Sequence, residues 1–294
     1  METYRWSELT RLGHTQDQVR AQMRAGNLVK VRHGVYAPAS EVGYAEQHTR
    51  LVQATMRGLK PGAVVSHFSA ALLHGLPVPA AQLDRVWITR SGERTSRVKG
   101  SVRLHRAPLA RADCTRVQGL PVTSLARTAV DVACRLDFPT GVAVVDAALA
   151  RSVARHDLQA VVLSTRGATG IGRAREAVEF GDGRSESVGE SRSRALMLQY
   201  GVPLPDLQRE LHDRDGFIGR VDFWWEQQRV VGEFDGKIKY SRELAPGGDP
   251  AEALWLEKRR EDRIRRARHG VVRWTWRDLT RPRSWADGLI AALR

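Results

Sequence analysis

Residues 221–240 read V-D-F-W-W-E-Q-Q-R-V-V-G-E-F-D-G-K-I-K-Y, and this stretch decides the interpretation of the C-terminal third of the chain. Two apolar-rich runs, residues 221–225 and 229–237, flank the polar residues 226–228. Runs of this length that are rich in Val, Phe and Trp and are joined by a short polar segment are typical of a β-hairpin. The stretch therefore predicts two antiparallel strands.

The hairpin predicts a cluster of charge on one of its faces. Because side chains alternate along a strand, four charged residues share a face of the second strand: Glu233, Asp235, Lys237 and Lys239. A turn at residues 227–228 sets Asp222 opposite Glu233, with β-carbons about 5 Å apart. Carboxylates this close repel unless a cation lies between them. We therefore expect a Mg²⁺ (or Mn²⁺) site held by Asp222, Glu233 and Asp235; the alternative is a sheet surface of ordinary salt bridges.

The same residues resemble a known nuclease motif. Asp222, followed thirteen residues later by Asp235-Gly236-Lys237, resembles the PD-(D/E)xK core, and Glu233-Phe-Asp235-Gly236 resembles the very-short-patch-repair-like endonucleases. Val221 stands where the motif has a proline, and either Glu233 or Asp235 can be the inner metal ligand. The resemblance covers residues 185–294 and implies metal-assisted hydrolysis of DNA, in which Lys237 orients the water or contacts the phosphate.

Residues 182–294 are therefore expected to form a restriction-endonuclease-like αβββαβ domain. The expected elements are a helix from residue 185, strands at 207–212, 217–225 and 229–239, a helix at 251–268 and a strand at 271–276. Glu190 is a further catalytic candidate, because it lies off the apolar stripe of Val188, Ala195 and Leu198. The alternative for Glu190 is an ion pair with Arg194, four residues along the helix.

Composition favours a nucleic-acid partner. The chain has 294 residues, a net charge of +14 and a pI near 10.7, which suggests two or three domains and a polyanionic partner such as double-stranded DNA. A charge run such as 257–268 is usually a solvated face, yet beside a nuclease strand it offers phosphate contacts. The C-terminal candidates for DNA binding are Lys239, Lys258, Arg260 and Arg263.

Cysteine usage and hydropathy set the expected compartment. Only Cys114 and Cys134 are present, without a Cys/His cluster, so neither a disulfide framework nor a zinc ribbon is expected. The sequence has no run of eighteen apolar residues and no secretory leader pattern. These features predict a soluble protein of the reducing cytoplasm with no membrane partner.

The N-terminus predicts a DNA-binding unit. Ser7 can cap a first helix, and Thr15 with Gln18 forms a capping box for a second helix that ends at Gly26. His33-Gly34 is a tight turn between two short strands. Residues 1–40 then form a winged helix-turn-helix; the alternative is an αα-ββ lid with solvated arginines. The candidate DNA contacts are Arg20, Arg24, Lys30 and Arg32.

Residues 7–150 also resemble the N-terminal antitoxin domain of AbiEi-type proteins. The motifs that carry the resemblance are Arg24-Ala-Gly26, Val31-Arg-His-Gly34-Val-Tyr-Ala-Pro38, the V-V-S-H-F-S-A-A-L-L-H-G-L stretch at 64–76 and the G-L-P-V-T-S-L-A-R-T-A-V-D stretch at 119–131. The resemblance implies operator binding, repression of a toxin–antitoxin or abortive-infection operon, and a nucleotidyltransferase toxin as a candidate partner.

The middle region, residues 41–181, offers little chemistry. We expect mixed α/β structure, with helices at 44–59, 66–76, 124–134 and 142–153 and strands at 85–89 and 101–106. His67 and His74 are two helical turns apart, which favours ordinary core or surface histidines over a zinc site. Ser124 is expected to cap a helix.

The chain is thus expected to be an α+β or α/β multidomain protein with domains at 1–40, 41–181 and 182–294. Three functions remain open. The first is a DNA endonuclease of defence or repair. The second is an antitoxin-type transcriptional regulator with an inactive nuclease-like domain. The third is an interaction protein with a merely basic surface, for which DNA binding would be weak and steeply salt-dependent.

Overall fold

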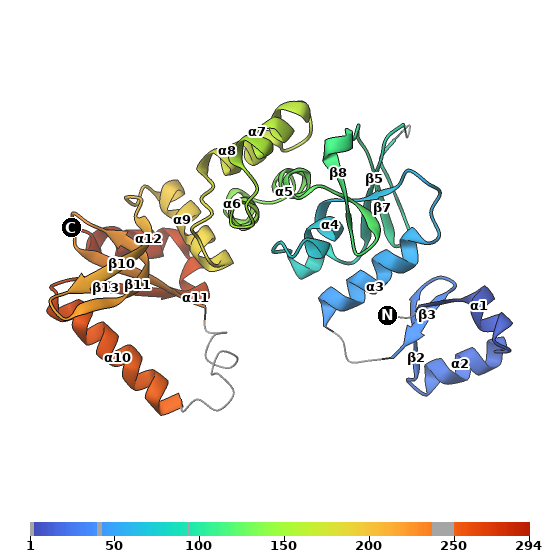
Figure 1. Cartoon of the computed structure of the whole chain (residues 1–294), viewed down its shortest axis with the longest axis horizontal. Coiled ribbons are helices and arrows are strands. Elements are labelled where there is room, and N and C mark those ends of the chain that lie inside the picture. The colour runs from blue at the N-terminus through green and yellow to red at the C-terminus, as the bar shows by residue number, and fades with distance from the viewer. Residues whose placement is uncertain (1–2, 40–42, 93–94, 237–249) are drawn as a thin grey trace. The chain divides into compact units, whose positions relative to one another are not determined.

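The computed structural model describes residues 3–39, 43–92, 95–236 and 250–294, which form two compact units. One unit comprises Met1–Val132 with His156–Arg166, and the other comprises Ala133–Arg155 with Gly167–Arg294. The predicted domain boundary at 40/41 falls inside the first unit, and the one at 181/182 falls inside the second. Mixed α+β architecture is confirmed, with helices and sheets in both units (Figure 1).

The chain opens with a small helix–helix–hairpin segment. Its elements are β1 (Tyr4–Arg5), α1 (Trp6–Arg11), α2 (Gln16–Arg24), β2 (Leu28–Arg32) and β3 (Val35–Pro38), with strand order β1-β3-β2. The predicted capping box is confirmed, since the backbone N–H of Gln18 donates to the Thr15 hydroxyl and the backbone N–H of Thr15 donates to the Gln18 side chain. Gly34 adopts φ +71° in the hairpin turn, a conformation that favours glycine.

Two details of this segment differ from the prediction. Helix α1 begins at Trp6 with Arg5 as its N-cap, so Ser7 lies inside the helix rather than capping it. The backbone N–H of Arg5 donates to Glu8 at 2.6 Å, which satisfies the helix end without a Ser hydroxyl. Arg32 is half-buried rather than outward-facing, because its guanidinium donates to the Thr55 carbonyl at 3.4 Å.

A six-stranded mixed sheet forms the rest of the first unit's core. Its strand order is β6-β7-β5-β4-β9-β8. The strands are β4 (Val64–Val65), β5 (Val86–Arg90), β6 (Arg97–Lys99), β7 (Val102–Arg106), β8 (Cys114–Val117) and β9 (Leu120–Thr123), and the helices are α3 (Tyr44–Met56), α4 (His67–Leu73) and α5 (Leu125–Ala133). Val52 of α3 and Ala70 of α4 pack with Val65, Ile88 and other strand residues into one apolar cluster.

Three helices follow along the chain: α6 (Phe138–Leu149), α7 (Arg155–Ser164) and α8 (Ile171–Phe180). Helix α6 begins four residues before the predicted start at 142, because the Asp137 side chain accepts the backbone N–H of Thr140 at 3.2 Å and caps the helix there. Pro139 fits this start, since its fixed φ suits the first helical turn. Helices α7 and α8 were not predicted.

The C-terminal part of the second unit carries the six elements that the sequence predicted there, followed by two helices that were not predicted. They run α9 (Val188–Tyr200), β10 (Asp206–Asp213), β11 (Gly216–Trp225), β12 (Val230–Asp235), α10 (Pro250–Arg266), β13 (Gly270–Thr275), α11 (Trp276–Leu279) and α12 (Pro282–Ala292). The strand order is β10-β11-β12-β13. β11 runs antiparallel to both of its neighbours, β10 and β12, whereas β13 runs parallel to β12. The element order αβββαβ is as predicted; its assignment to an endonuclease fold stays a prediction.

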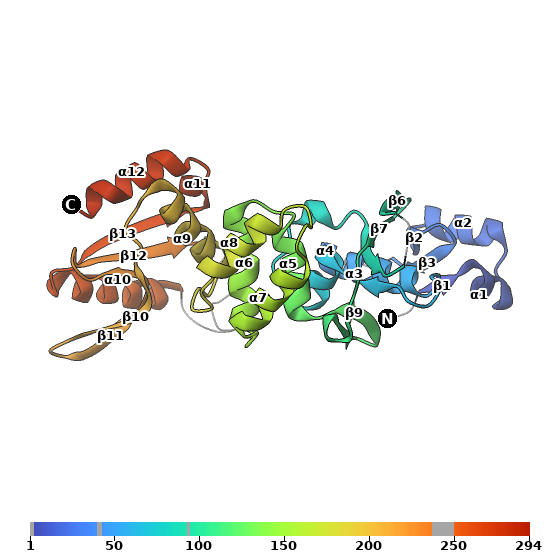
Figure 2. The same cartoon turned by 90° about the horizontal axis from the view of Figure 1, so that it is seen from above.

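The two faces of this sheet are covered by different helices. Phe223 and Trp274 pack with Met197 of α9 and Leu289 of α12, whereas Ile264 of α10 joins a second cluster on the other face (Figure 2). The first face is close-packed: a β-carbon added at Gly189 of α9 would lie 1.9 Å from the Phe234 ring. A side chain larger than hydrogen at position 189 would therefore push α9 away from β12.

The tryptophans of the C-terminal segment differ in burial. Trp224 and Trp274 are buried. Trp276 is 38% exposed, because β13 ends at Thr275 and the chain turns into α11 at that point. Among the helices that the structure describes, none combines the length and the apolar character needed to cross a membrane.

Candidate functional site

The acidic hairpin predicted from residues 221–240 is formed by β11 and β12. Their ladder pairs Trp225 with Val230 and Phe223 with Gly232, and the same register continued by one residue sets Asp222 opposite Glu233. The Oδ2 atom of Asp222 accepts the backbone N–H of Phe234 at 2.9 Å. The carboxylate thus holds the end of β12 against β11, where the regular ladder stops.

Glu233 is held by two guanidinium groups. Its Oε1 accepts from Arg260 of α10 at 2.7 Å, and its Oε2 accepts from Arg273 of β13 at 3.0 Å. Charge-assisted pairs of this length are among the stronger polar contacts in proteins. Arg273 also contacts Glu261 at 3.2 Å. Glu233 therefore ties α10 and β13 to β12, and the repulsion predicted between Glu233 and Asp222 is relieved by arginines.

Asp235 is half-buried at the last position of β12, beside Thr275 of the parallel strand. Lys237 and Lys239, predicted to act on the phosphate, lie outside the described residues. The structure therefore brings Asp222, Glu233 and Asp235 to the same end of one hairpin.

Glu190 is buried at the start of α9, and its catalytic role stays a prediction. It is 5% exposed, and its Oε2 accepts the backbone N–H of Glu186 at 2.9 Å and the Gln208 amide at 3.0 Å. The pair with Arg194 does not form, since Arg194 points to Asp146 instead. The apolar stripe was also misplaced, because Val188 and Leu198 are exposed while Glu190 and Arg194 are buried.

The Mg²⁺ site expected at Asp222, Glu233 and Asp235 stays a prediction. Within the ranges 3–39, 43–92, 95–236 and 250–294, no three His, Cys, Asp or Glu side chains are grouped so that they could hold a metal ion. Magnesium demands near-octahedral oxygen ligands, and a cation at Glu233 would first have to displace Arg260 and Arg273. We therefore derive no hydrolytic step from these residues.

Three of the four predicted N-terminal DNA contacts lie on the surface. Arg20 and Arg24 of α2 are exposed, four residues apart on one helix, and Lys30 of β2 is exposed on the adjoining hairpin. Arg20 approaches Asp17 at 3.6 Å, a surface pair that holds the side chain only weakly. Arg32, bound to Thr55, faces inward.

Two of the three described C-terminal candidates carry internal contacts. Arg260 binds Glu233 and the Arg220 carbonyl, and Arg263 makes a bidentate pair with Asp213 at 3.0 and 2.6 Å. The hydrogen bond from Arg263 lowers the pKa of Asp213. These two arginines fasten α10 to the β10–β11 sheet, whereas Lys258 is exposed.

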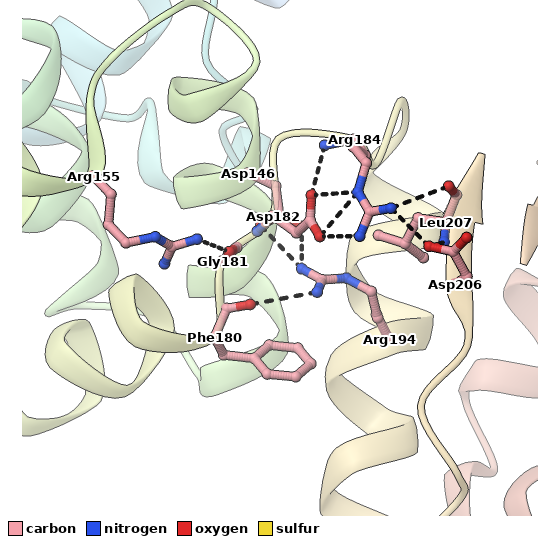
Figure 3. Close-up of polar contacts among 9 residues, drawn as sticks. All are labelled: Asp146, Arg155, Phe180, Gly181, Asp182, Arg184, Arg194, Asp206 and Leu207. Atoms are coloured by element: carbon pink, nitrogen blue, oxygen red, sulfur yellow. Dashed lines mark hydrogen bonds and ion pairs between the residues drawn. The ribbon is translucent and has the colours of Figure 1, made fainter. Parts of the chain in front are cut away.

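Sequence analysis missed a buried ionic network in the second unit (Figure 3). Asp146 of α6 accepts from Arg194 of α9, and it also accepts the backbone N–H of Asp182 at 2.7 Å. The Arg194 guanidinium lies 4.5 Å from the centre of the Phe180 ring. Arg184 extends the network by pairing with Asp182 at 2.9 Å and Asp206 at 2.7 Å. The sequence indicates this network only through Asp146, an aspartate at a position of α6 where the helical pattern places an apolar residue.

Sequence analysis also missed a pocket beside β13. It is lined by Val272, Trp274, Trp285 and Leu289, together with three arginines of the same region. These arginines were not predicted as binding residues, because they lie outside the nuclease-like motif of residues 222–237.

Comparison with known proteins assigns the middle of the chain to a described domain. Residues 63–180 match the family model of the AbiEi antitoxin C-terminal domain. This match supports the antitoxin resemblance over that range; because it ends at residue 180, the endonuclease resemblance of residues 182–294 stays a prediction. The chain is also similar to the crystal structure of the RV2827C protein from Mycobacterium tuberculosis. The similarity covers 72% of this chain and 84% of that protein, at 18% identity and a TM-score of 0.41.

A relative extends over almost the whole chain. The uncharacterized Mycobacterium tuberculosis protein Rv2248 of strain H37Rv is 35% identical over 265 residues, and the alignment covers 89% of this chain and 88% of the relative. The corresponding protein MT2308 of strain CDC 1551 matches equally. The chain therefore belongs to the same protein family as these mycobacterial proteins, with an AbiEi antitoxin C-terminal-like domain at residues 63–180.

Proposed function

We propose that the protein is a DNA-binding transcriptional regulator of the AbiEi antitoxin type, which represses an operon that also encodes its toxin. The observation that carries this proposal is the match of residues 63–180 to the antitoxin C-terminal domain. A helix–helix–hairpin segment precedes the matched range, and α3 lies between the two. A domain of antitoxin type joined to a DNA-reading segment is what a regulator of its own operon requires.

Exposed cations support DNA binding by the N-terminal segment. Arg20 and Arg24 lie on α2, which follows α1 after a short turn as the second helix of a helix-turn-helix does. The hairpin β2–β3 next to it presents Lys30 to solvent. In this arrangement α2 would enter the major groove, and the hairpin would contact the phosphates of the flanking backbone.

The remaining charge of the chain favours association with any polyanion. A net charge of +14 steers DNA towards the protein without selecting a sequence. Specificity has to come from base contacts, for which α2 is the candidate element. The proposal therefore requires that the protein bind one DNA sequence more tightly than other DNA.

Competition binding tests this requirement. The full chain is titrated onto labelled DNA from upstream of its own gene, with unlabelled calf-thymus DNA as competitor. We expect tight binding that survives the competitor, and we expect Arg20→Ala/Arg24→Ala to remove it. The control is Arg166→Ala/Arg175→Ala, which deletes two exposed arginines outside the N-terminal segment. An equal loss of affinity in both variants would show that net charge accounts for the binding, and it would contradict the proposal.

The toxin partner is tested separately in cells. Expression of the neighbouring toxin gene should arrest growth, and co-expression of the full chain should restore it. Restoration that persists in Arg20→Ala/Arg24→Ala would show that neutralisation and DNA binding use different parts of the chain. If the protein restores no growth, the antitoxin half of the proposal is wrong even where DNA binding holds.

A metal-dependent endonuclease is the second candidate function. One observation favours it: Asp222, Glu233 and Asp235 lie at the same end of the β11–β12 hairpin within an αβββαβ element order. The test is cleavage of supercoiled plasmid with Mg²⁺ or Mn²⁺, beside an EDTA control and the variant Glu233→Ala/Asp235→Ala. Metal-dependent nicking that the variant loses would establish the activity. Absence of nicking on plasmid and on operator DNA would remove this candidate.

A further inference from the structure

A pocket with an aromatic floor and a basic mouth lies at the edge of the C-terminal sheet. Its volume is about 370 Å³, and its walls come from β13, α11 and α12. In the order β10-β11-β12-β13, the strand β13 is the last, so the pocket lies at the sheet's margin. Small-molecule sites occupy about 300–1,000 Å³, which places this pocket at the size of one small ligand.

The floor of the pocket is rigid. Trp274 is 2% exposed, and its indole N–H donates to the Ser193 hydroxyl of α9 at 2.7 Å. Trp285 of α12 packs against Trp274 with ring centroids 5.5 Å apart. Leu289 is buried one helical turn further on. The two indole planes are tilted by 54°, and the partly buried Trp285 offers an aromatic ring on which a flat aromatic ligand can stack.

The mouth of the pocket carries two available guanidinium groups. Arg277 of α11 and Arg281, the residue before α12, are both exposed. Neither side chain makes a hydrogen bond or ion pair with any residue that the structure describes. Arg273 also lines the pocket, but its guanidinium is engaged by Glu233 and Glu261.

One carboxylate lines the pocket, and it is already occupied. Asp278 accepts the backbone N–H of Thr275 at 2.7 Å and the Thr275 hydroxyl at 2.9 Å, so it caps α11. The backbone hydrogen bond lowers the pKa of Asp278. Arg277 adds to this lowering through its charge, and the hydrogen bonds of Asp278 are made to Thr275 at the helix end, so the guanidinium donors of Arg277 and Arg281 are open to an incoming anion.

We propose that this pocket binds a nucleotide, with the base against Trp285 and the phosphate between Arg277 and Arg281. Guanidinium groups bind phosphate through paired N–H donors, and bases of any identity stack on aromatic rings. The ligand is a nucleoside monophosphate unit, supplied either as a free nucleotide or as an unpaired nucleotide of a DNA strand. The site uses no residue of the N-terminal segment, so it stands or falls independently of operator binding.

Calorimetric titration of the full chain tests the proposal with deoxyadenosine monophosphate, inorganic phosphate and a single-stranded oligonucleotide as separate ligands. The variant is Arg277→Ala/Arg281→Ala, whose exposed side chains make no hydrogen bond to the residues that the structure describes. The matched control is Arg283→Ala, an exposed arginine of α12 that lies over the Tyr200 ring and does not line the pocket. A second variant, Trp285→Leu, removes the aromatic surface.

We expect saturable binding of the mononucleotide that weakens about tenfold or more in the double variant, as the loss of charge-assisted hydrogen bonds predicts. Arg283→Ala should bind as the unmodified chain does, and Trp285→Leu should bind the mononucleotide no better than phosphate. Tighter binding of the oligonucleotide would assign the site to a DNA strand; tighter binding of the mononucleotide would assign it to free nucleotides. Phosphate binding as tight as that of the mononucleotide, equal loss in Arg283→Ala, or no saturable binding would overturn the proposal.

Discussion

Asp146 on α6 accepts two hydrogen bonds from Arg194 Nη2 on α9, at 3.2 and 3.0 Å, across 48 residues of sequence. Asp146 lies inside the range matched by the antitoxin domain, and Arg194 lies beyond its end at residue 180. Both belong to one compact unit. The end of the matched range is therefore not a structural boundary: α6 is fastened to the helix that begins the C-terminal αβββαβ segment (Figure 3).

Removing one partner of this pair should destabilise the second unit strongly. Asp146 is 1% exposed and Arg194 6% exposed, so Asp146→Ala leaves a buried guanidinium without its carboxylate. A loss of about 3–5 kcal/mol in the free energy of unfolding is expected for a broken buried pair. Chemical denaturation followed by tryptophan fluorescence measures it. The double variant Asp146→Leu/Arg194→Met should lose less than Asp146→Ala, and an equal or larger loss would contradict the role of the unpaired charge.

Glu233 should behave as a structural residue in stability measurements. Glu233→Ala deprives Arg260 and Arg273 of their carboxylate, and we expect a loss of about 1–3 kcal/mol, the range for hydrogen bonds to charged groups. If Glu233 were instead a strained metal ligand, its removal would raise the melting temperature. Thermal melting with and without Mg²⁺ distinguishes the two, because a cation that binds only the folded chain raises its melting temperature.

The pair of Asp213 with Arg263 predicts an acid-dependent loss of stability. The hydrogen bond from Arg263 holds the pKa of Asp213 below the usual range of an aspartate. The folded state therefore binds fewer protons at this group than the unfolded state. Its contribution is fully present above pH 3.8 and is lost as the pH falls through the depressed value. Between pH 6 and pH 3, the melting temperature should fall less steeply with decreasing pH for Asp213→Asn than for the unmodified chain. Identical slopes of melting temperature against pH would contradict the assignment.

The salt dependence of operator binding reports the N-terminal contacts. Each neutralised phosphate adds about 0.9 to the slope of log K against log salt concentration. If Arg20 and Arg24 each contact one phosphate, Arg20→Ala/Arg24→Ala should reduce the magnitude of the slope by about 2. Fluorescence anisotropy over a series of salt concentrations gives the slope. An unchanged slope together with weaker binding would move these side chains from phosphates to base edges.

The C-terminal elements were predictable because they are long and strongly patterned. Ten residues of β11 and seventeen of α10 give a periodicity that a short element lacks. β4 has two residues and β6 has three, so neither shows alternation, and the six-stranded sheet of the first unit went unpredicted. The same limit explains why only β5 and β7 of that sheet were expected.

The sequence predicted only those features of the candidate site that lie within one hairpin. A short turn sets the register of a hairpin, so Asp222 opposite Glu233 followed from sequence. The partners of Glu233 did not, because Arg260 and Arg273 lie 27 and 40 residues further along the chain. Arg194 shows the same limit on α9: its burial depends on Asp146, which no helical pattern can reveal.

Selection from the genome tests the central claim most directly. Sheared genomic DNA is incubated with the full chain, bound fragments are recovered and sequenced, and the experiment is repeated with Arg20→Ala/Arg24→Ala. The account predicts a small set of enriched fragments that share a short motif. This set should include the region upstream of the protein's own gene, and the variant should enrich none of these fragments. Uniform recovery of fragments, or an enriched set that the variant retains, would contradict a regulator that reads DNA through its N-terminal segment.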